Sequence, residues 1–145
     1  MSRENKALIR RWFKEVWDKG RADAIDEMFA SDGLAHGLSG DDGNPVQDAE
    51  GFKTFHRNFR GAFPDVAVTV VDTVAEGDKI AARCVVRATH KGDGLGFAAT
   101  QKPVEITGIL IARIKRGKIV ESWNNFDFLS LNRQLGVTPD SAPES

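Results

Sequence analysis

Residues 65–92 read DVAVTVVDTVAEGDKIAARCVVRATHKG, and this stretch decides the predicted fold class. Apolar and polar residues alternate along both of its halves, which is the period-two pattern of half-buried β-strands. Residues 76–78, Glu-Gly-Asp, have the composition of a tight turn, so the two halves are predicted to form a hairpin. A second hairpin is predicted over residues 103–128, PVEITGILIARIKRGKIVESWNNFDF, with its turn at residues 115–117. The two hairpins together predict a four-stranded antiparallel meander.

Before residue 65 the apolar residues recur at helical spacing instead. Helices are predicted over residues 5–19, 22–29 and 50–62, and residues 31–51 are predicted to be a loop rich in Gly, Asp and Ser. The first helix presents one wide apolar stripe, made of Leu8, Ile9, Trp12, Phe13, Val16 and Trp17. Helices followed by an antiparallel sheet define the α+β class, and helices packed on one face of a curved sheet make a cone. The interior of a cone is filled either by side chains or by a ligand.

Length and composition set further bounds. The 145 residues favour a single domain over residues 1–136, followed by a flexible tail over residues 137–145. The formal net charge is −1 without a block of like charge, so neither a nucleic-acid nor a membrane partner is expected. The sequence shows no apolar run that would span a bilayer and no signal peptide, so a cytoplasmic protein is expected. Cys84 is the only cysteine and is expected to be buried and inert.

The last predicted strand carries the candidate chemistry. Counted by simple alternation, the face predicted to point into the cone holds Ile119, Glu121, Trp123, Asn125 and Asp127. Asp127 lies between two phenylalanines, and burial raises the pKa of a carboxylate, which would make it a base for a proton on a carbon beside a carbonyl. The hydrogen-bond donor to the enolate oxygen is expected to be Asn125, His36 or Trp123. Two other interpretations of Asp127 stay open, because it could cap the closing turn at residues 129–136 or pair with an arginine.

The remaining candidates are histidines and apolar residues. His36, in the segment LAHGL, either moves a proton at the mouth of the cavity or is an ordinary surface-loop residue. His90 ends the second strand of the first hairpin and is a candidate substrate contact. Trp17, Phe59 and Phe63 are core residues that are also expected to form walls of the cavity. The histidines do not have the spacing of a zinc site, so no metal is expected.

In their order and spacing, residues 7–37, 50–92 and 116–136 resemble the SnoaL-like polyketide cyclase (ester cyclase) family of the NTF2-like superfamily. The resemblance covers almost the whole chain up to residue 136. It implies an NTF2-like cone with a deep pocket and a homodimer formed through the exposed face of the sheet. It also implies an intramolecular aldol condensation that closes a ring in a polyketide ester, without cofactor or metal.

The resemblance further implies roles for individual residues. The segment WNNFD at residues 123–127 is similar to the family's W-x-x-x-D pattern, which implies that Asp127 is the acid/base. His36 is similar to the loop histidine of the family. Trp17 and Trp123 are similar to residues that line the pocket.

The sequence as a whole therefore predicts a small enzyme that uses acid/base catalysis without a cofactor on an apolar carbonyl compound in an internal pocket. Two departures from common family residues leave the substrate open, namely Cys84 in place of an aromatic residue and the segment AATQK at residues 98–102. Two alternatives also stay open. One is an epoxide hydrolase, isomerase or dehydratase on the same fold, and the other is a protein that binds a small molecule without catalysis.

Overall fold

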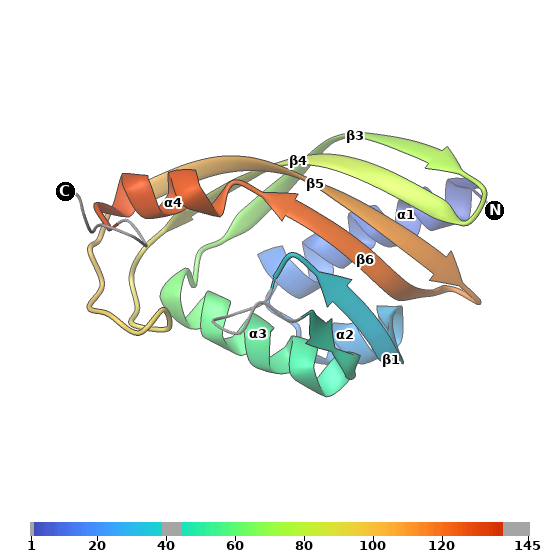
Figure 1. The fold of residues 1–145 in the computed structure, drawn as a ribbon, viewed down its shortest axis with the longest axis horizontal. Helices are drawn as coiled ribbons and strands as arrows, with labels where there is room; N and C mark the ends of the chain where they lie inside the picture. The colour runs from blue at the N-terminus through green and yellow to red at the C-terminus, as the bar shows by residue number, and fades with distance from the viewer. Residues whose placement is uncertain (1, 39–44, 138–145) are drawn as a thin grey trace.

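The computed structural model describes residues 2–38 and 45–137 (Figure 1). Its helical elements are α1 (Ser2–Trp12), the π-helix η1 (Phe13–Asp18), α2 (Asp23–Met28), α3 (Asp48–Ala62) and α4 (Phe128–Leu135). Its strands are β1 (Phe29–His36), β2 (Val46–Gln47), β3 (Ala67–Glu76), β4 (Lys79–Thr89), β5 (Pro103–Lys115) and β6 (Lys118–Phe126). These strands form one sheet in the order β2-β1-β6-β5-β4-β3.

The helices and the sheet form two layers. In Figure 1 the sheet arches over α1, α2 and α3, and α4 continues from β6 at the far end of the sheet. The inner face of the sheet is the one toward these helices, and the outer face is the opposite one. Alternate residues of β4 and β5 turn inward and are buried, among them Ile80, Cys84, Ile106 and Leu110. The core therefore lies between the inner face and the helices, and the predicted α+β class is confirmed.

The predicted four-stranded meander is also confirmed. Strands β3, β4, β5 and β6 pair consecutively and antiparallel. Gly77 and Gly117 stand in the two hairpin turns with φ angles of 60° and 76°. This left-handed region is open to glycine at little cost, because glycine has no Cβ. The glycines that predicted the two hairpin turns are therefore the residues whose backbone conformation forms those turns.

Residues 31–51 are not the simple loop that their composition predicts. Strand β1 runs parallel to β6, with His36 opposite Trp123, and β2 extends the sheet beyond β1. The sheet is therefore mixed rather than purely antiparallel. The apolar alternation in β1 is weak, since its buried residues are only Phe29, Gly33 and Ala35. Its pairing depends on a strand near the other end of the chain, which local composition does not reveal.

Some predictions concern the chain ends and membrane association. No helix within the described residues is long and apolar enough to cross a bilayer. Residues 138–145 of the predicted tail lie outside the described residues, as do residues 39–44 of the predicted loop. The boundary at residue 136, which directly follows α4, stays a prediction.

Candidate functional site

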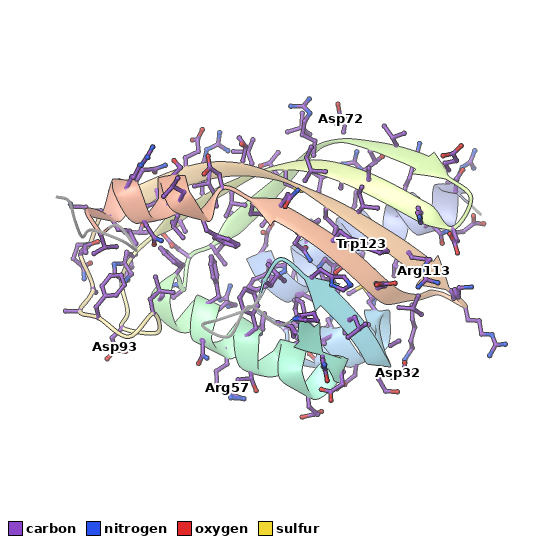
Figure 2. The ribbon with its side chains drawn as sticks, viewed as in Figure 1. Asp32, Arg57, Asp72, Asp93, Arg113 and Trp123 are labelled. Carbon is purple, nitrogen blue, oxygen red and sulfur yellow. The ribbon has the colours of Figure 1, made fainter. Side chains whose placement is uncertain are left out.

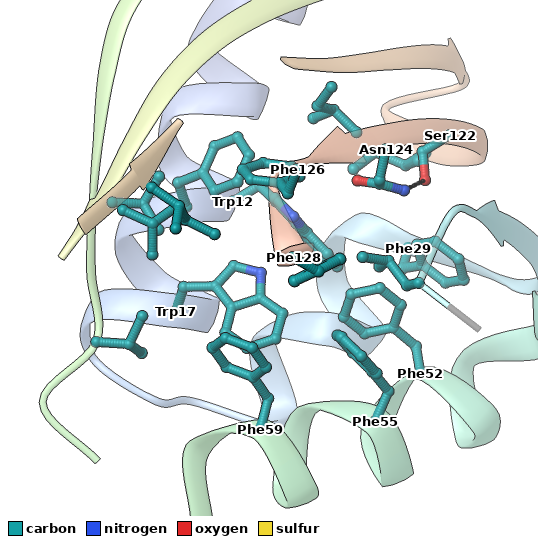
Figure 3. A pocket seen from close by; sticks show the side chains of 18 residues that line it. Trp12, Trp17, Phe29, Phe52, Phe55, Phe59, Ser122, Asn124, Phe126 and Phe128 are labelled. Carbon is teal, nitrogen blue, oxygen red and sulfur yellow. Dashed lines mark hydrogen bonds between the residues drawn. The ribbon is translucent and has the colours of Figure 1, made fainter. Parts of the chain in front are cut away.

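A pocket lies between the inner face of the sheet and the helices, and its cavity volume is about 60 Å³ (Figure 3). Half of its lining residues are aromatic, among them Trp12, Trp17, Phe52, Phe55, Phe59 and Phe126. The rings support one another, since the centroid of Phe52 lies 5.1 Å from that of Trp12 and 6.1 Å from that of Trp17. These are favourable separations for aromatic pairs. The walls therefore suit an apolar molecule that contains rings.

Two residues of β6 form the polar edge of this pocket. Within the described residues, Ser122 and Asn124 are the only polar side chains in the lining besides the indole N–H groups of its tryptophans, and none of the lining side chains is ionisable. The Asn124 amide donates to the His36 carbonyl oxygen (2.9 Å) and to Ser122 Oγ (3.1 Å), so both of its hydrogens are engaged. Asn124 Oδ1 has no partner in the described part of the chain. The Ser122 hydroxyl hydrogen is not used in these bonds, so the polar edge has one free acceptor, Asn124 Oδ1, and one free donor, the Ser122 hydroxyl.

An irregularity in β6 decides which of its side chains reach the pocket. The pairing with β5 advances from residue 119 to residue 121 on β6 while it advances by one residue on β5, so Val120 is the extra residue of a β-bulge. Beyond the bulge, the side chains that line the pocket are those of Ser122, Asn124 and Phe126. The side chains on the outer face are those of Glu121, Trp123 and Asn125. The predicted inward face is therefore correct at Ile119 and wrong from Glu121 onward, because simple alternation does not allow for a bulge.

Asp127 lies outside the pocket. The Ser130 backbone N–H donates to Asp127 Oδ1 at 3.0 Å, so this exposed aspartate is the N-cap of α4. Its neighbours Phe126 and Phe128 line the pocket, but its carboxylate does not. The predicted inward orientation of Asp127 is thus wrong, and the capping interpretation describes its contacts. The acid/base role that the resemblance implies stays a prediction.

His36 lies at the seam between β1 and β6, beside the outer face. Its Nε2–H donates to Glu121 Oε2 at 2.8 Å, and the Arg113 guanidinium donates to Glu121 Oε1 at 2.6 Å. These two hydrogen bonds hold the pKa of Glu121 below its ordinary value. The imidazole stacks on Trp123 with 5.7 Å between ring centroids (Figure 2 labels Trp123 and Arg113). The His36 side chain is therefore not part of the pocket lining, and only its backbone carbonyl orients Asn124.

The other predicted wall residues divide between the pocket and the surrounding core. Trp17 and Phe59 line the pocket, and their contact with a substrate stays a prediction. Phe63 and His90 are fully buried but do not line it. The Thr100 backbone N–H donates to His90 Nδ1 at 3.1 Å, which places the imidazole hydrogen on Nε2. His90 therefore ties β4 to the segment that follows it rather than to the pocket.

Helix α1 passes into the π-helix η1, and this change aligns two tryptophans. Trp12 and Trp17 are five residues apart, which in an α-helix would separate their directions by about 140°. A π-turn bonds residues five apart, as the Lys19 N–H does to the Lys14 carbonyl at 2.9 Å, and so turns such residues toward the same side. Both indoles consequently line the pocket.

Hydrogen bonds from α3 hold this π-turn in place. His56 Nε2–H donates to the Val16 carbonyl at 2.7 Å, and the Arg60 guanidinium donates to the Trp17 carbonyl at 2.6 Å. Burial lowers the pKa of His56, so its imidazole is neutral at neutral pH. Because these donors are far away in sequence, the pattern over residues 5–19 predicts an ordinary α-helix and misses the π-turn.

The comparisons with known proteins agree with this architecture. A sequence profile described as SnoaL-like polyketide cyclase matches residues 7–135, which is most of the chain. The chain belongs to the SnoaL-like polyketide cyclase family. No curated protein matches it.

Solved structures similar to this SnoaL-like protein carry related descriptions. IdmH of Streptomyces antibioticus, a "putative polyketide cyclase", is 32% identical, with a TM-score of 0.78 over 92% of this chain and 99% of IdmH. A "putative polyketide cyclase" of Acidithiobacillus ferrooxidans is 27% identical, with a TM-score of 0.79 over 92% and 94% of the two chains. AclR of Streptomyces galilaeus, a "putative hydroxylase", is 29% identical, with a TM-score of 0.78 over 97% and 85%. The predicted family and its NTF2-like fold are confirmed.

Sequence reasoning missed most of the residues that line the pocket of this SnoaL-like protein, and those that bear polar atoms are Trp12, Ser122 and Asn124. A signal for Trp12 was present, because it belongs to the same apolar stripe as Trp17. The signal for Ser122 and Asn124 was weaker. Both alternate with Phe126 on one face of the strand, whereas Ile119 would lie on the opposite face by simple alternation. Because Ile119 is also buried, only a bulge between them allows Ser122 and Asn124 to point inward.

The arrangement of candidate metal ligands and the place of the single cysteine can be described for the SnoaL-like fold. Within residues 2–38 and 45–137, no group of three His, Cys, Asp or Glu side chains is arranged to hold a metal ion. Cys84 is buried on the inner face, and burial raises the pKa of its thiol to about 11. A thiol with such a pKa carries almost no thiolate at neutral pH. The prediction of a buried cysteine is confirmed, and its inertness stays a prediction.

Proposed function

We propose that this protein binds an apolar, ring-bearing carbonyl compound in its pocket and promotes aldol-type ring closure without a cofactor. The observation that carries the proposal is a pocket with aromatic walls and a single polar edge at Ser122 and Asn124. Aromatic faces suit flat apolar rings, and a small number of polar groups suits a ligand with few oxygen atoms. Membership of the family and the similarity to IdmH support the reaction class.

Ring closure of this kind moves protons and forms one carbon–carbon bond. A base takes a proton from a carbon beside one carbonyl, and the enolate carbon then attacks a second carbonyl carbon of the same molecule. The new alkoxide oxygen finally takes up a proton. A pocket that holds the substrate folded brings the two carbons together, which lowers the barrier through proximity. At the polar edge, the Ser122 hydroxyl is free to donate to an oxygen that gains charge.

The position of Asp127 outside the pocket lining limits its contribution as a general base. None of the described lining side chains is ionisable, so a base from the described part of the chain would have to act from outside this lining. Asp127 would first have to leave its capping position on α4, which costs about 1 kcal/mol. We therefore propose that positioning and hydrogen bonding supply more of the rate than proton abstraction by Asp127.

A matched pair of substitutions tests the role of the pocket. Leu110→Trp fills the pocket, whereas Ile109→Trp places the same ring on the outer face one residue away. The assay is closure of an aryl-substituted 1,5-diketone followed by chromatography. The rate is expected to fall about tenfold or more in Leu110→Trp, because proximity effects depend on a correct fit, and to stay near wild type in Ile109→Trp. Equal rates in the three proteins would contradict a reaction in this pocket.

The same assay with Asp127→Asn separates the two sources of catalysis. A general base contributes roughly 10²–10⁴-fold, so a fall of less than about tenfold is expected if positioning dominates. A fall of about a hundredfold or more would instead establish Asp127 as the base.

Binding without catalysis is the second candidate function. The absence of an ionisable side chain from the described lining favours it. It predicts that wild-type protein binds aromatic ketones but converts no diketone. An epoxide hydrolase is not favoured, because neither aspartate nor arginine contributes to the described lining.

We also propose that a second copy of the chain covers the outer face of the sheet. One cross-strand row on this face consists of Val74, Ala81, Ile111 and Trp123. Three of these residues are large apolar side chains exposed to solvent in the single chain. Beside the row, Arg83 and Asp72 form an ion pair at 3.1 Å, and Figure 2 shows Asp72 projecting from the sheet. A face with an apolar centre and charges of both signs is suited to pairing with itself.

A further inference from the structure

We infer that the indole N–H groups of Trp12 and Trp17 form a donor pair that binds a carbonyl oxygen of the ligand. This inference rests on the proposed function, because it concerns the same pocket. It names the protein atoms, the two indole nitrogens, that would distinguish a ketone or ester from a hydrocarbon of the same shape. The polar edge at Ser122 and Asn124 supplies one donor, the Ser122 hydroxyl, and one acceptor, the free amide oxygen, so the two indoles would add two donors at a second place in the lining.

The two indoles are held in the lining of the same pocket. The π-helix η1 brings Trp12 and Trp17 to one side, and both line the pocket. In Figure 3 both indoles stand among the lining side chains, and the ring nitrogen of Trp17 lies toward the middle of the group. Trp12 packs against Phe52 at 5.1 Å and Trp17 against Phe59 at 5.6 Å between ring centroids. This packing fixes the direction of each N–H without a hydrogen bond.

Neither indole N–H has an acceptor within the described residues. Buried tryptophans usually do give their N–H a partner. In the described part of the chain, His90 Nε2 is the only fully buried side-chain nitrogen or oxygen without a hydrogen-bond partner. The two indole nitrogens also have no partner, so they are not fully buried and each is accessible to solvent. Trp12 and Trp17 are only 4% and 8% exposed, so the space that their nitrogens meet is mainly the pocket. An acceptor on a ligand would satisfy both donors.

The chemistry of the pair selects a neutral carbonyl. An indole N–H can only donate, and a carbonyl oxygen has two lone pairs that can accept from both rings. Because the donors and the described walls are uncharged, a ketone or ester is bound without burying an ion. As a carbonyl oxygen becomes an enolate or alkoxide, preorganised donors stabilise its growing charge. The same pair would therefore serve both recognition and ring closure.

Two ligands of nearly equal shape test the inference. 9-Fluorenone and fluorene differ only in having a carbonyl or a methylene group at one ring position. Calorimetry measures the affinity of both for wild type, for Trp12→Phe and for Trp17→Phe, with Trp123→Phe on the outer face as the control. The ratio of fluorenone to fluorene affinity is expected to fall about fivefold in each of the first two variants, the usual net effect of one hydrogen bond. The control is expected to keep the wild-type ratio.

Nuclear magnetic resonance of ¹⁵N-labelled wild type gives a second measurement that needs no substitution. The three tryptophans each contribute one indole N–H signal. Fluorenone, relative to fluorene, is expected to move the signals of Trp12 and Trp17 downfield and to leave that of Trp123 unchanged. If both ligands bind with the same shifts, and the affinity ratio is unaltered in the variants, the donor pair is refuted while the proposed binding function stands. If neither ligand binds, the proposed function fails, and the inference fails with it.

Discussion

The two faces of the sheet are built from the same strands but meet different surroundings. On β5, Ile106, Leu110 and Ile114 turn inward and are at most 4% exposed, whereas Ile109 and Ile111 turn outward and are 45% and 38% exposed. Helices α1 to α3 cover the inner face, so its apolar residues stabilise the fold and line the pocket. The outer isoleucines contribute less to the fold of one chain. The comparison teaches that apolar alternation identifies a strand but does not say which face is the core.

The largest effect is expected from truncating the same residue type on each face. Ile80 on β4 is fully buried, and Ile80→Ala is expected to lower the free energy of unfolding by about 2–5 kcal/mol, since it leaves a cavity. Ile111→Ala is expected to change it by about 0.5 kcal/mol or less in the monomer. Urea denaturation at low protein concentration measures both values. Similar losses in the two variants would mean that the outer face is as important to the fold as the inner one.

Position 111 also tests whether a second copy covers the outer face. Ile111→Lys places a charge in the apolar row and is expected to shift a homodimer to monomers in sedimentation equilibrium, with little effect on ligand binding in the pocket. Ile80→Ala, in contrast, is expected to leave the proportion of dimer in the folded protein unchanged. A wild-type protein that is monomeric at high concentration would refute the proposed dimer.

A smaller effect is expected at His56, which joins α3 to the π-turn. His56→Phe keeps a ring beside Trp17 but leaves the Val16 carbonyl without its donor, so a loss of about 1–3 kcal/mol is expected. The neighbouring exposed residue supplies the control, because Arg57→Ala is expected to change stability by about 0.5 kcal/mol or less. Equal effects of the two substitutions would argue against a structural role for the His56 bond.

The pH dependence gives His56 a further signature. Its pKa in the folded protein is lowered by burial from an ordinary value of 6.5. Below that pH the unfolded chain takes up a proton that the folded chain resists, so stability is lost as the pH falls toward the folded-state pKa. Part of this acid slope is expected to disappear in His56→Phe. An unchanged slope between wild type and variant would show that other groups cause it.

The smallest effect is expected at Asp127, which lies between two pocket residues but faces away from the pocket. As an N-cap, it is expected to contribute about 1 kcal/mol, measured by Asp127→Ala, whereas Asp127→Asn keeps a capping side chain and is expected to be nearly neutral. If Asp127→Asn and Asp127→Ala were equally destabilising, the carboxylate charge rather than the cap would be the important feature.

Much of the fold could be predicted from local patterns. The hairpins of β3–β4 and β5–β6 follow from alternation and from glycine turns, and α3 follows from its row of phenylalanines and the proline after it. Strand β1 could not be predicted in this way, because its partner β6 lies near the other end of the chain. Long-range pairing decides a strand whose own sequence is rich in Gly, Asp and Ser.

The candidate site was less accessible to prediction than the fold. One extra residue, Val120, exchanges the faces of β6, so the predicted inward set of Trp123, Asn125 and Asp127 lies outside the pocket, while Ser122 and Asn124 line it. Trp17 and Phe59 could be placed correctly, because helical stripes tolerate small errors of phase better than strands do. A strand has only two faces, so a single added residue reverses every assignment after it.

The π-turn η1 has a consequence for how relatives of this chain are aligned. A homologue with one residue fewer between its two tryptophans could keep both on one side with an ordinary α-helix, because residues four apart differ in direction by about 40°. A homologue of equal length that formed an ordinary α-helix would instead direct its second tryptophan about 140° away from the first. Its alignment would show no gap and hardly any change in percentage identity, yet its two indoles could not both donate to one oxygen atom.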